Sequence, residues 1–146
     1  MPGSRSPRFG HDYVVRGAYS FEGPAIQWLF TDTPVARLDW DQSLDGSWVL
    51  AVHPGKPEYY GCLSIVASRP IGRLEMLKLA PSLPYKLKAL ITRDLINYSL
   101  TLCKQLGCQA VTGASEQALV PTFGRTIQHQ WKAVETGQFT GYLARI

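Results

Sequence analysis

The sequence predicts an α/β (α+β) fold, a single domain built on a mixed but mostly antiparallel sheet. Short segments rich in β-branched and aromatic residues precede one long amphipathic helix, and further strand-like segments follow it. Because helices lie between some of the strands, part of the sheet has to be parallel. The predicted element order is β-α-α-β-β-β-α-β-α-β-β.

Composition fixes the broad class. The 146 residues are 45% hydrophobic and 18% charged, which supports one packed core and excludes a disordered chain. No apolar run is long enough to span a membrane, and the first residues lack the apolar stretch of a secretory signal. Cys62, Cys103 and Cys108 have neither C-x-x-C nor zinc-ligand spacing, so we expect buried reduced thiols and no metal site. A cytoplasmic protein is the expectation.

The charge is unevenly distributed. The net charge is +4, but residues 1–60 carry −2 and residues 61–146 carry +6. The second part of the chain is therefore suited to an anionic partner. A small phosphorylated ligand fits better than nucleic acid, since the basic residues are scattered and form no block.

The N-terminal third contains one strand and two helices. Residues 1–10 are predicted to be a flexible basic arm, and residues 11–146 a single domain. Tyr13–Tyr19 is a short strand and Phe21–Phe30 a short helix with a proline in its first turn. A second helix begins at Asp32 or Thr33 and ends near Trp40 or Leu44.

Three antiparallel strands follow. Ser47–His53 and Tyr59–Ser68 flank the turn Pro54–Glu58, and Gly72–Leu79 comes next. In the last strand, strict alternation places Leu74, Met76 and Lys78 on one face and Glu75, Leu77 and Leu79 on the other.

The long helix is the strongest single signal. Ser82 is its expected N-cap, Pro84 lies in its first turn, and Gly107 ends it in left-handed geometry. Its apolar stripe consists of Leu83, Leu87, Leu90, Ile91, Leu95, Tyr98, Leu102 and Leu106. Beyond it we expect a strand at Gln109–Gly113, a helix at Ser115–Arg125 interrupted by Pro121, and a hairpin made of Trp131–Glu135 and Phe139–Ile146.

This order, from Tyr13 to the end, resembles the Gcn5-related N-acetyltransferase (GNAT) fold. The segment that most suggests it runs from Leu74 through Leu106 into Gly107-Cys108-Gln109-Ala110-Val111. The resemblance implies that the turn and first helical turn cradle the pyrophosphate of acetyl-CoA, and that the preceding strand pairs with the pantetheine arm. The implied cofactor-binding residues are Leu77, Leu79, Ser82, Tyr85, Lys86, Leu87, Lys88 and Ala89.

The charges at the helix start fit an anion. Lys86 and Lys88 lie in the first turn, and no acid follows until Asp94. Each lysine there costs about 0.3–1 kcal/mol against the helix dipole, and a bound anion reverses the sign. The alternative is that both lysine stems cover apolar surface and the ammonium groups are solvated.

The phosphate loop departs from the family pattern. The family pattern is Arg or Gln, any two residues, Gly, any one residue, then Gly or Ala. In the corresponding segment from Pro84 to Ala89, only Ala89 matches this pattern, and Leu87 stands in place of the glycine. The loop is therefore degenerate. In the second family pattern this chain has Ser115, Ala118, Thr122 and Thr126-Ile127. Thr122 replaces the tyrosine that often protonates the leaving thiolate, and Tyr142, Tyr98 and Tyr85 are the substitutes available.

Glu75 lies on the strand where some family members carry a catalytic glutamate, and a carboxylate there could deprotonate an amine. The structural alternative is a surface glutamate paired with Arg73 or Lys78. His53 and His129 are other candidate bases, while His11 is assigned to the flexible arm.

Three functions stay open. The first is a divergent acetyltransferase that binds acyl-CoA, with Glu75 and Tyr142 as catalytic candidates and an unknown amine acceptor or protein partner. The second is a non-catalytic accessory protein of phage virions or phage assembly, similar to degenerate acetyltransferases of short-tailed phages, on the basis of Gly137, Gln138 and Phe139 and the glycine-poor loop. The third is a basic module that binds nucleic acid or a partner. In the resembling fold the closing strands often form dimer surfaces, which is compatible with a homodimer.

Overall fold

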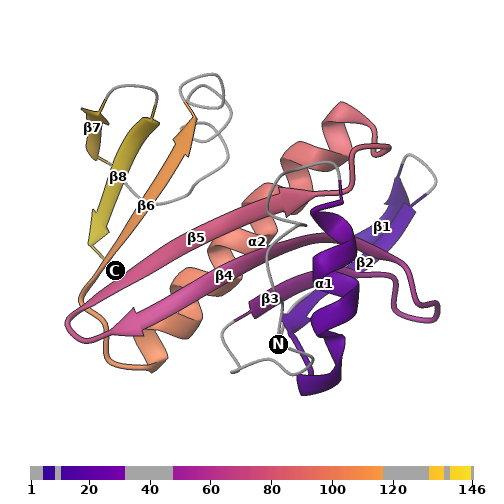
Figure 1. The fold of residues 1–146 in the computed structure, drawn as a ribbon, viewed down its shortest axis with the longest axis horizontal. Helices are drawn as coiled ribbons and strands as arrows, with labels where there is room; N and C mark the ends of the chain where they lie inside the picture. The colour runs from indigo at the N-terminus through magenta and orange to yellow at the C-terminus, as the bar shows by residue number, and fades with distance from the viewer. Residues whose placement is uncertain (1–4, 9–10, 32–47, 117–131, 137–138, 146) are drawn as a thin grey trace.

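The computed structural model describes residues 5–8, 11–31, 48–116, 132–136 and 139–145. Its eight described strands form one sheet in the order β1-β2-β3-β4-β5-β6-β8-β7 (Figure 1). Among them only the β5–β6 pairing is parallel. The strands are β1 Arg5–Arg8, β2 His11–Gly17, β3 Trp48–Val52, β4 Tyr59–Ser68, β5 Ile71–Leu79, β6 Ala110–Glu116, β7 Lys132–Thr136 and β8 Phe139–Arg145; the helices are η1 Ser20–Glu22, α1 Gly23–Leu29 and α2 Tyr85–Gln105. The α/β class and the mostly antiparallel sheet are confirmed.

The two α-helices cover opposite faces of the sheet. Figure 1 shows α1 in front of the strands and α2 behind them. Four consecutive residues of β3, Val49–Val52, are all buried, as expected for a strand with a helix over each face. The buried side of α2 includes Leu87, Ile91 and Leu95, so this part of the predicted apolar stripe faces the core, whereas Leu106 is half exposed at the end of the helix.

Helix α2 begins and ends close to the predicted residues. Gly107 follows it with a φ of +93°, the left-handed conformation expected at this position. The prediction for Ser82 is wrong: Pro84 occupies the N-cap, and Ser82 lies exposed in the preceding turn. None of the described side chains caps the helix. Proline ends the non-helical turn here because its fixed φ suits the residue before the first helical turn.

The chain differs from the prediction in two further places. Residues Arg5–Arg8 of the predicted arm form β1 and pair with β2. Strand β6 continues to Glu116, where Ser115 and Glu116 pair with Thr140 and Phe139 of β8, so no helix begins at Ser115. Ladder pairing with β8 overrides the helical preference of this segment. The predicted helix at Asp32–Leu44 and the remainder of the one ending at Arg125 lie outside the described residues.

A bulge in β5 breaks the predicted alternation. Met76 has a φ of +52°, and the β4–β5 register shifts between Cys62 and Ser64. A Cβ on Gly72 would meet Cys103 of α2, and a Cβ on Gly61 would meet the side chains of both Leu79 and Leu95. Gly72 and, by alternation, Leu74 therefore face α2, and so does Leu79. Leu74 and Leu79 share a face, contrary to the prediction.

The remaining global expectations concern membranes, metals and thiols. No helix among the described residues is long and apolar enough to span a membrane. The described part of the chain holds no cluster of metal-ligating side chains. Cys62, Cys103 and Cys108 are free and buried, as predicted, and burial raises the pKa of Cys62 to about 12 and of Cys103 to about 11.

Candidate functional site

The sheet forks between its two central strands. Ile71–Leu74 of β5 pair with Ala110–Gly113 of β6, and the pairing stops there. Beyond that point β5 pairs only with β4 among the described strands, and β6 only with β8. Figure 1 shows the two ribbons diverging from this point. Each strand therefore leaves one edge of backbone N–H and C=O groups directed into the fork.

The backbone of β5 places specific groups on that open edge. The Ala80 N–H donates to the carbonyl of Tyr60 at 2.9 Å, so Ala80 is directed toward β4. Because successive peptide groups alternate in a regular strand, Lys78 is directed the same way as Ala80 and Leu79 toward the fork, while Leu77 lies in the irregular stretch of the bulge. Leu79 thus lies where an extended ligand could add hydrogen bonds to β5.

The open edge leads to the N-terminus of α2. Pro84 is the N-cap, no side chain in the described part of the chain caps the helix, and its first turn holds no acidic residue. The N–H groups of Tyr85, Lys86 and Leu87 have no partner within the helix, as in the first turn of any α-helix. The helix start is therefore electropositive, and the exposed Lys86 adds a full positive charge.

Leu87 does not obstruct this turn. At this position the resembling family has glycine, because backbone has to approach the phosphates closely. The Leu87 side chain is 1% exposed and packs in the hydrophobic core. Its side chain therefore points away from solvent, and the residues present at the turn fit a diphosphate.

The two candidate catalytic residues are placed near the fork. Glu75 directly follows the last β5–β6 pair, and its Oε1 lies 3.5 Å from Nε of Arg73, both side chains being largely exposed. Tyr142 of β8 pairs with Gly113, which itself pairs with Leu74. Three adjacent strands therefore bring Leu74, Gly113 and Tyr142 into one row. The side chain of Tyr142 lies outside the described residues.

The other candidates are less favourably placed. His53 accepts a hydrogen bond from the Gly55 N–H at 2.9 Å on Nδ1, so it stabilises the β3–β4 turn. Tyr85 is 70% exposed at the start of α2, and Tyr98 is half-buried in the same helix. His129 and Thr122 lie outside the described residues, as does the side chain of His11.

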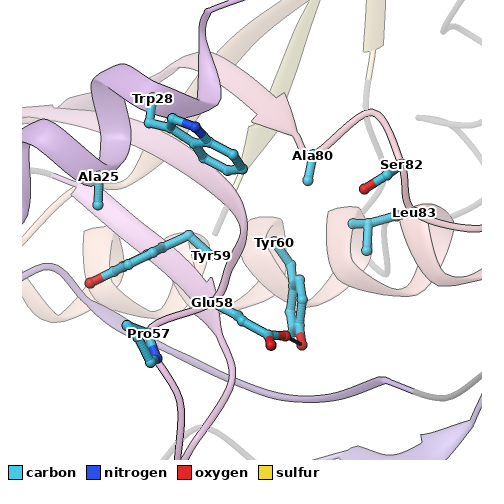
Figure 2. A pocket seen from close by; sticks show the side chains of 9 residues that line it. All are labelled: Ala25, Trp28, Pro57, Glu58, Tyr59, Tyr60, Ala80, Ser82 and Leu83. Carbon is cyan, nitrogen blue, oxygen red and sulfur yellow. Dashed lines mark hydrogen bonds between the residues drawn. The ribbon is translucent and has the colours of Figure 1, made fainter.

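Sequence reasoning missed a pocket on the α1 side of the sheet. Its volume is about 430 Å³, and α1, the β3–β4 turn, the start of β4 and the β5–α2 turn contribute its walls (Figure 2). The lining residues are Ala25, Trp28, Pro57, Glu58, Tyr59, Tyr60, Ala80, Ser82 and Leu83. The Tyr60 hydroxyl donates to Oε2 of Glu58 at 2.7 Å. In the sequence, the run Glu58-Tyr59-Tyr60 is the available signal for this pocket, but by itself it indicates only where the strand begins.

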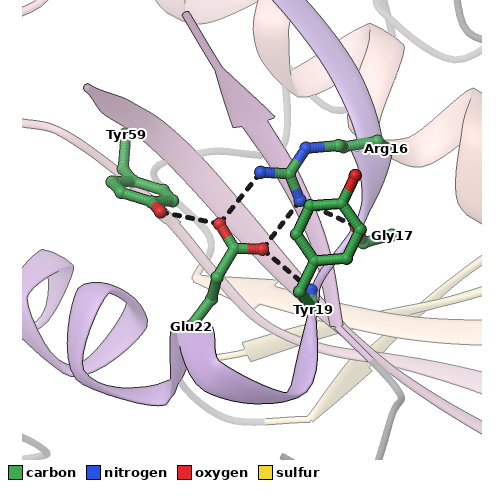
Figure 3. A network of polar contacts seen from close by, with 5 residues as sticks. All are labelled: Arg16, Gly17, Tyr19, Glu22 and Tyr59. Carbon is green, nitrogen blue, oxygen red and sulfur yellow. Dashed lines mark hydrogen bonds and ion pairs between the residues drawn. The ribbon is translucent and has the colours of Figure 1, made fainter. Parts of the chain in front are cut away.

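A buried polar network fixes the wall of this pocket. Glu22 is 2% exposed and accepts two hydrogen bonds from Arg16, at 2.7 and 2.9 Å, and one from the Tyr59 hydroxyl at 2.6 Å (Figure 3). The Tyr19 N–H donates to the same carboxylate at 2.8 Å, and the Arg16 guanidinium lies over the Tyr19 ring, 4.2 Å from its centroid. The network therefore joins β2, the η1 turn and β4.

The charges of this network shift the pKa of its members. Burial raises the pKa of the Glu22 carboxyl, but the hydrogen bonds from Arg16, Tyr59 and Tyr19 outweigh burial, so the net shift is downward. Burial and the hydrogen bond to Glu22 raise the pKa of Tyr59 to about 12. Glu22 is thus a carboxylate at neutral pH, and Tyr59 is a neutral hydrogen-bond donor.

Comparison with known proteins gives a result at the level of structure. No protein-family model and no curated protein sequence matches the chain. Among solved structures, N-acetylglutamate synthase from Neisseria gonorrhoeae, complexed with coenzyme A and N-acetyl-glutamate, superposes with a TM-score of 0.68 at 14% identity. The match covers 91% of this chain but 35% of the synthase, so the chain spans about a third of its length.

Two smaller proteins match over nearly their whole length. A GNAT-family acetyltransferase from Listeria monocytogenes gives a TM-score of 0.65 at 13% identity, covering 99% of this chain and 100% of that one. Diaminobutyrate acetyltransferase from Paenibacillus lautus, in complex with L-2,4-diaminobutyric acid and coenzyme A, gives 0.63 at 12% identity, covering 91% and 94%. The forked sheet, the long helix that follows β5 and these superpositions together show that the chain has the GNAT fold.

Proposed function

We propose that the chain binds acyl-CoA in the fork between β5 and β6 and transfers an acetyl group to an amine. The observation that carries this proposal is the position of the fork: among the described residues, the β5 edge has no pairing strand beyond Leu74 and leads to a helix N-terminus without a side-chain cap. The structural neighbours support it at the level of the fold, since two of those named above were solved with coenzyme A.

The diphosphate belongs at the start of α2. The unpaired N–H groups of Tyr85, Lys86 and Leu87 supply donors, and Lys86 and Lys88 supply charge. Ser82 and Ala89 flank this turn and complete the set of predicted contacts. The pantetheine arm would lie along β5, with its amides on backbone groups of Leu79 and of Leu77 in the bulge.

When bound, acetyl-CoA supplies a thioester whose acetyl group passes to the amine, and the CoA thiol is the other product. In this proposal Glu75 accepts the proton that the amine loses, directly or through a water molecule. Tyr142 is the proposed donor of a proton to the leaving sulfur, because the register places it one strand beyond the end of the fork. Holding both reactants together supplies much of the rate enhancement.

Isothermal titration of the full chain with CoA tests the binding step. We expect saturable binding that the double substitution Lys86→Glu with Lys88→Glu weakens about tenfold or more, because two favourable charges become repulsive. Lys56→Glu with Lys104→Glu is the matched control, since it makes the same change of net charge at exposed positions outside the fork. Binding by the wild type should weaken as salt rises.

No heat at millimolar CoA, with the protein folded, would overturn the proposal. Equal weakening in both double variants would show a non-specific effect of net charge instead. The two alternative functions remain testable in the same preparation: a phage assembly role predicts no CoA binding, and a nucleic-acid module predicts binding to DNA or RNA that weakens steeply with salt.

A further inference from the structure

The pocket beside α1 combines aromatic walls with acidic groups. Figure 2 shows the Trp28 indole above it and the rings of Tyr59 and Tyr60 at its side, with the Glu58 carboxylate next to the Tyr60 hydroxyl. Trp28 is 59% exposed although it is the largest side chain in the wall. An exposed indole and a carboxylate in the walls of the same pocket are groups that attract organic cations.

Negative charge at this end of the pocket is only partly compensated. Oε2 of Glu58 accepts from Tyr60, and Oε1 has no hydrogen-bond partner among the described residues. Asp12 lies close enough to Tyr60 to contribute to the raised pKa of that phenol, behind the larger effects of burial and of Glu58. Oδ1 of Asp12 is buried and accepts no hydrogen bond from the described part of the chain. Glu22, by contrast, is already paired with Arg16.

These features exclude an anion and favour a cation. Among the described residues no lysine or arginine lines the pocket, so in this part of the wall a phosphate or carboxylate would meet Glu58 without a basic group. A purely apolar ligand would leave the negative charge of the Glu58 carboxylate without a counter-charge. An ammonium group on an apolar stem satisfies both parts of the wall, with the charge near Glu58 and the stem against Trp28 and Leu83.

We propose that this pocket binds an organic ammonium group carried on an apolar stem. The inference rests on the proposed function for its role: the pocket anchors the far end of the acyl acceptor. Ala80, in the pocket wall, lies five residues beyond Glu75, which corresponds to roughly 15 Å along a strand. The anchored group is therefore not the amine that reacts, and the acceptor carries a second basic group.

Titration followed by NMR tests the site with defined probes and without CoA. The probes are n-hexylammonium, the neutral 1-hexanol and the anionic hexanoate. We expect hexylammonium to shift the indole N–H of Trp28 and the backbone amides of Glu58 to Tyr60 in a saturable way. The affinity for hexanol should be at least about fivefold lower than that for hexylammonium, and hexanoate should not bind.

Substitutions separate the charge from the aromatic wall. Glu58→Gln should weaken hexylammonium binding about fivefold while leaving hexanol binding unchanged, and Trp28→Ala should abolish binding of both. Phe21→Ala is the matched control, since Phe21 is 73% exposed and lies outside the pocket wall. Trp28 is also exposed, so its replacement should leave the fold intact.

Equal affinity for hexylammonium and hexanol, or shifts located elsewhere, would overturn the proposal. Its failure is distinguishable from failure of the proposed function, because CoA binding is measured separately. CoA binding without ammonium binding removes the pocket proposal alone. Ammonium binding without CoA binding keeps the pocket and removes the transferase.

Discussion

Glu22 shows how one residue joins three elements. Its buried carboxylate accepts hydrogen bonds from β2, from the η1 turn and from β4. A buried charge is tolerated only when it is paired and hydrogen-bonded, and here Arg16 supplies the opposite charge. Glu22, at the residue before α1, therefore ties the start of this helix to β2 and β4.

Replacing Glu22 by Gln should lower the free energy of unfolding by about 2 kcal/mol or more, because Arg16 is left largely buried without its counter-charge. Denaturant unfolding monitored by circular dichroism measures it. Glu75→Gln is the matched control: its ion pair with Arg73 is exposed and 3.5 Å long, so less than about 1 kcal/mol is expected. Similar losses in the two variants would contradict the role assigned to Glu22.

The same substitution should change the response to acid. The pKa of Glu22 is lowered in the folded protein, so its contribution to stability is complete above the ordinary glutamate pKa of about 4.3 and is lost as the pH falls through the folded-state value. The difference in stability between the wild type and Glu22→Gln should therefore shrink in acid. A constant difference would contradict the lowered pKa.

At the scale of elements, the sequence predicts most of what hydrophobic periodicity controls. The apolar stripe of α2 and the segment Tyr59–Ser68 agree with the structure, since both patterns report directly which side is buried. Two features escape such reasoning. The bulge at Met76 depends on pairing with β4, and the extension of β6 to Glu116 depends on pairing with β8. Both are long-range effects that local patterns do not contain.

The C-terminus of α2 offers a test at this scale. Gly107→Ala should cost about 1–2 kcal/mol, because the φ of +93° disfavours any side chain and a Cβ would lie 2.7 Å from Cδ of Arg69. Gly17→Ala is the control, since a Cβ there meets nothing within 4 Å, and its effect should stay within about 0.5 kcal/mol. Thermal unfolding of both variants gives the comparison; equal effects would contradict the conformational argument.

For the candidate site, the sequence predicts location better than chemistry. Lys86 and Lys88 were identified because positive charge at a helix N-terminus is unusual, and the structure places them at the end of the open β5 edge. The pocket was missed because Trp28, Glu58 and Ser82 come from three segments that only the folded chain brings together. No spacing rule predicts such a cluster.

At the scale of the whole molecule, the described sheet consists of two antiparallel parts joined by one short parallel pairing. Strands β1 to β5 form the first part and β6, β8 and β7 the second, with four residue pairs, Ile71–Leu74 with Ala110–Gly113, between them. Helix α2 contacts the first part, through β2 to β5. Within the described part of the chain, the second part is therefore less packed against α2 than the first.

Hydrogen exchange should therefore divide the molecule at this pairing. We expect amides of β6 and β8 to exchange faster than those of β3 and β4, because the second part is joined to the first by four residue pairs among the described strands. Saturating CoA should slow exchange in both β5 and β6 if the ligand bridges them. Uniform protection across all strands without ligand would contradict the division.

The extra residue at Met76 also constrains how the chain can vary in length. With the bulge, Leu79 reaches the α2 side of the sheet. Removing one residue here would restore regular pleating. Every side chain from the bulge to the turn before α2 would then move to the opposite face of the sheet. Natural or engineered deletions are therefore expected in the β3–β4 turn, where they leave both the core and the fork unchanged, and not in this strand.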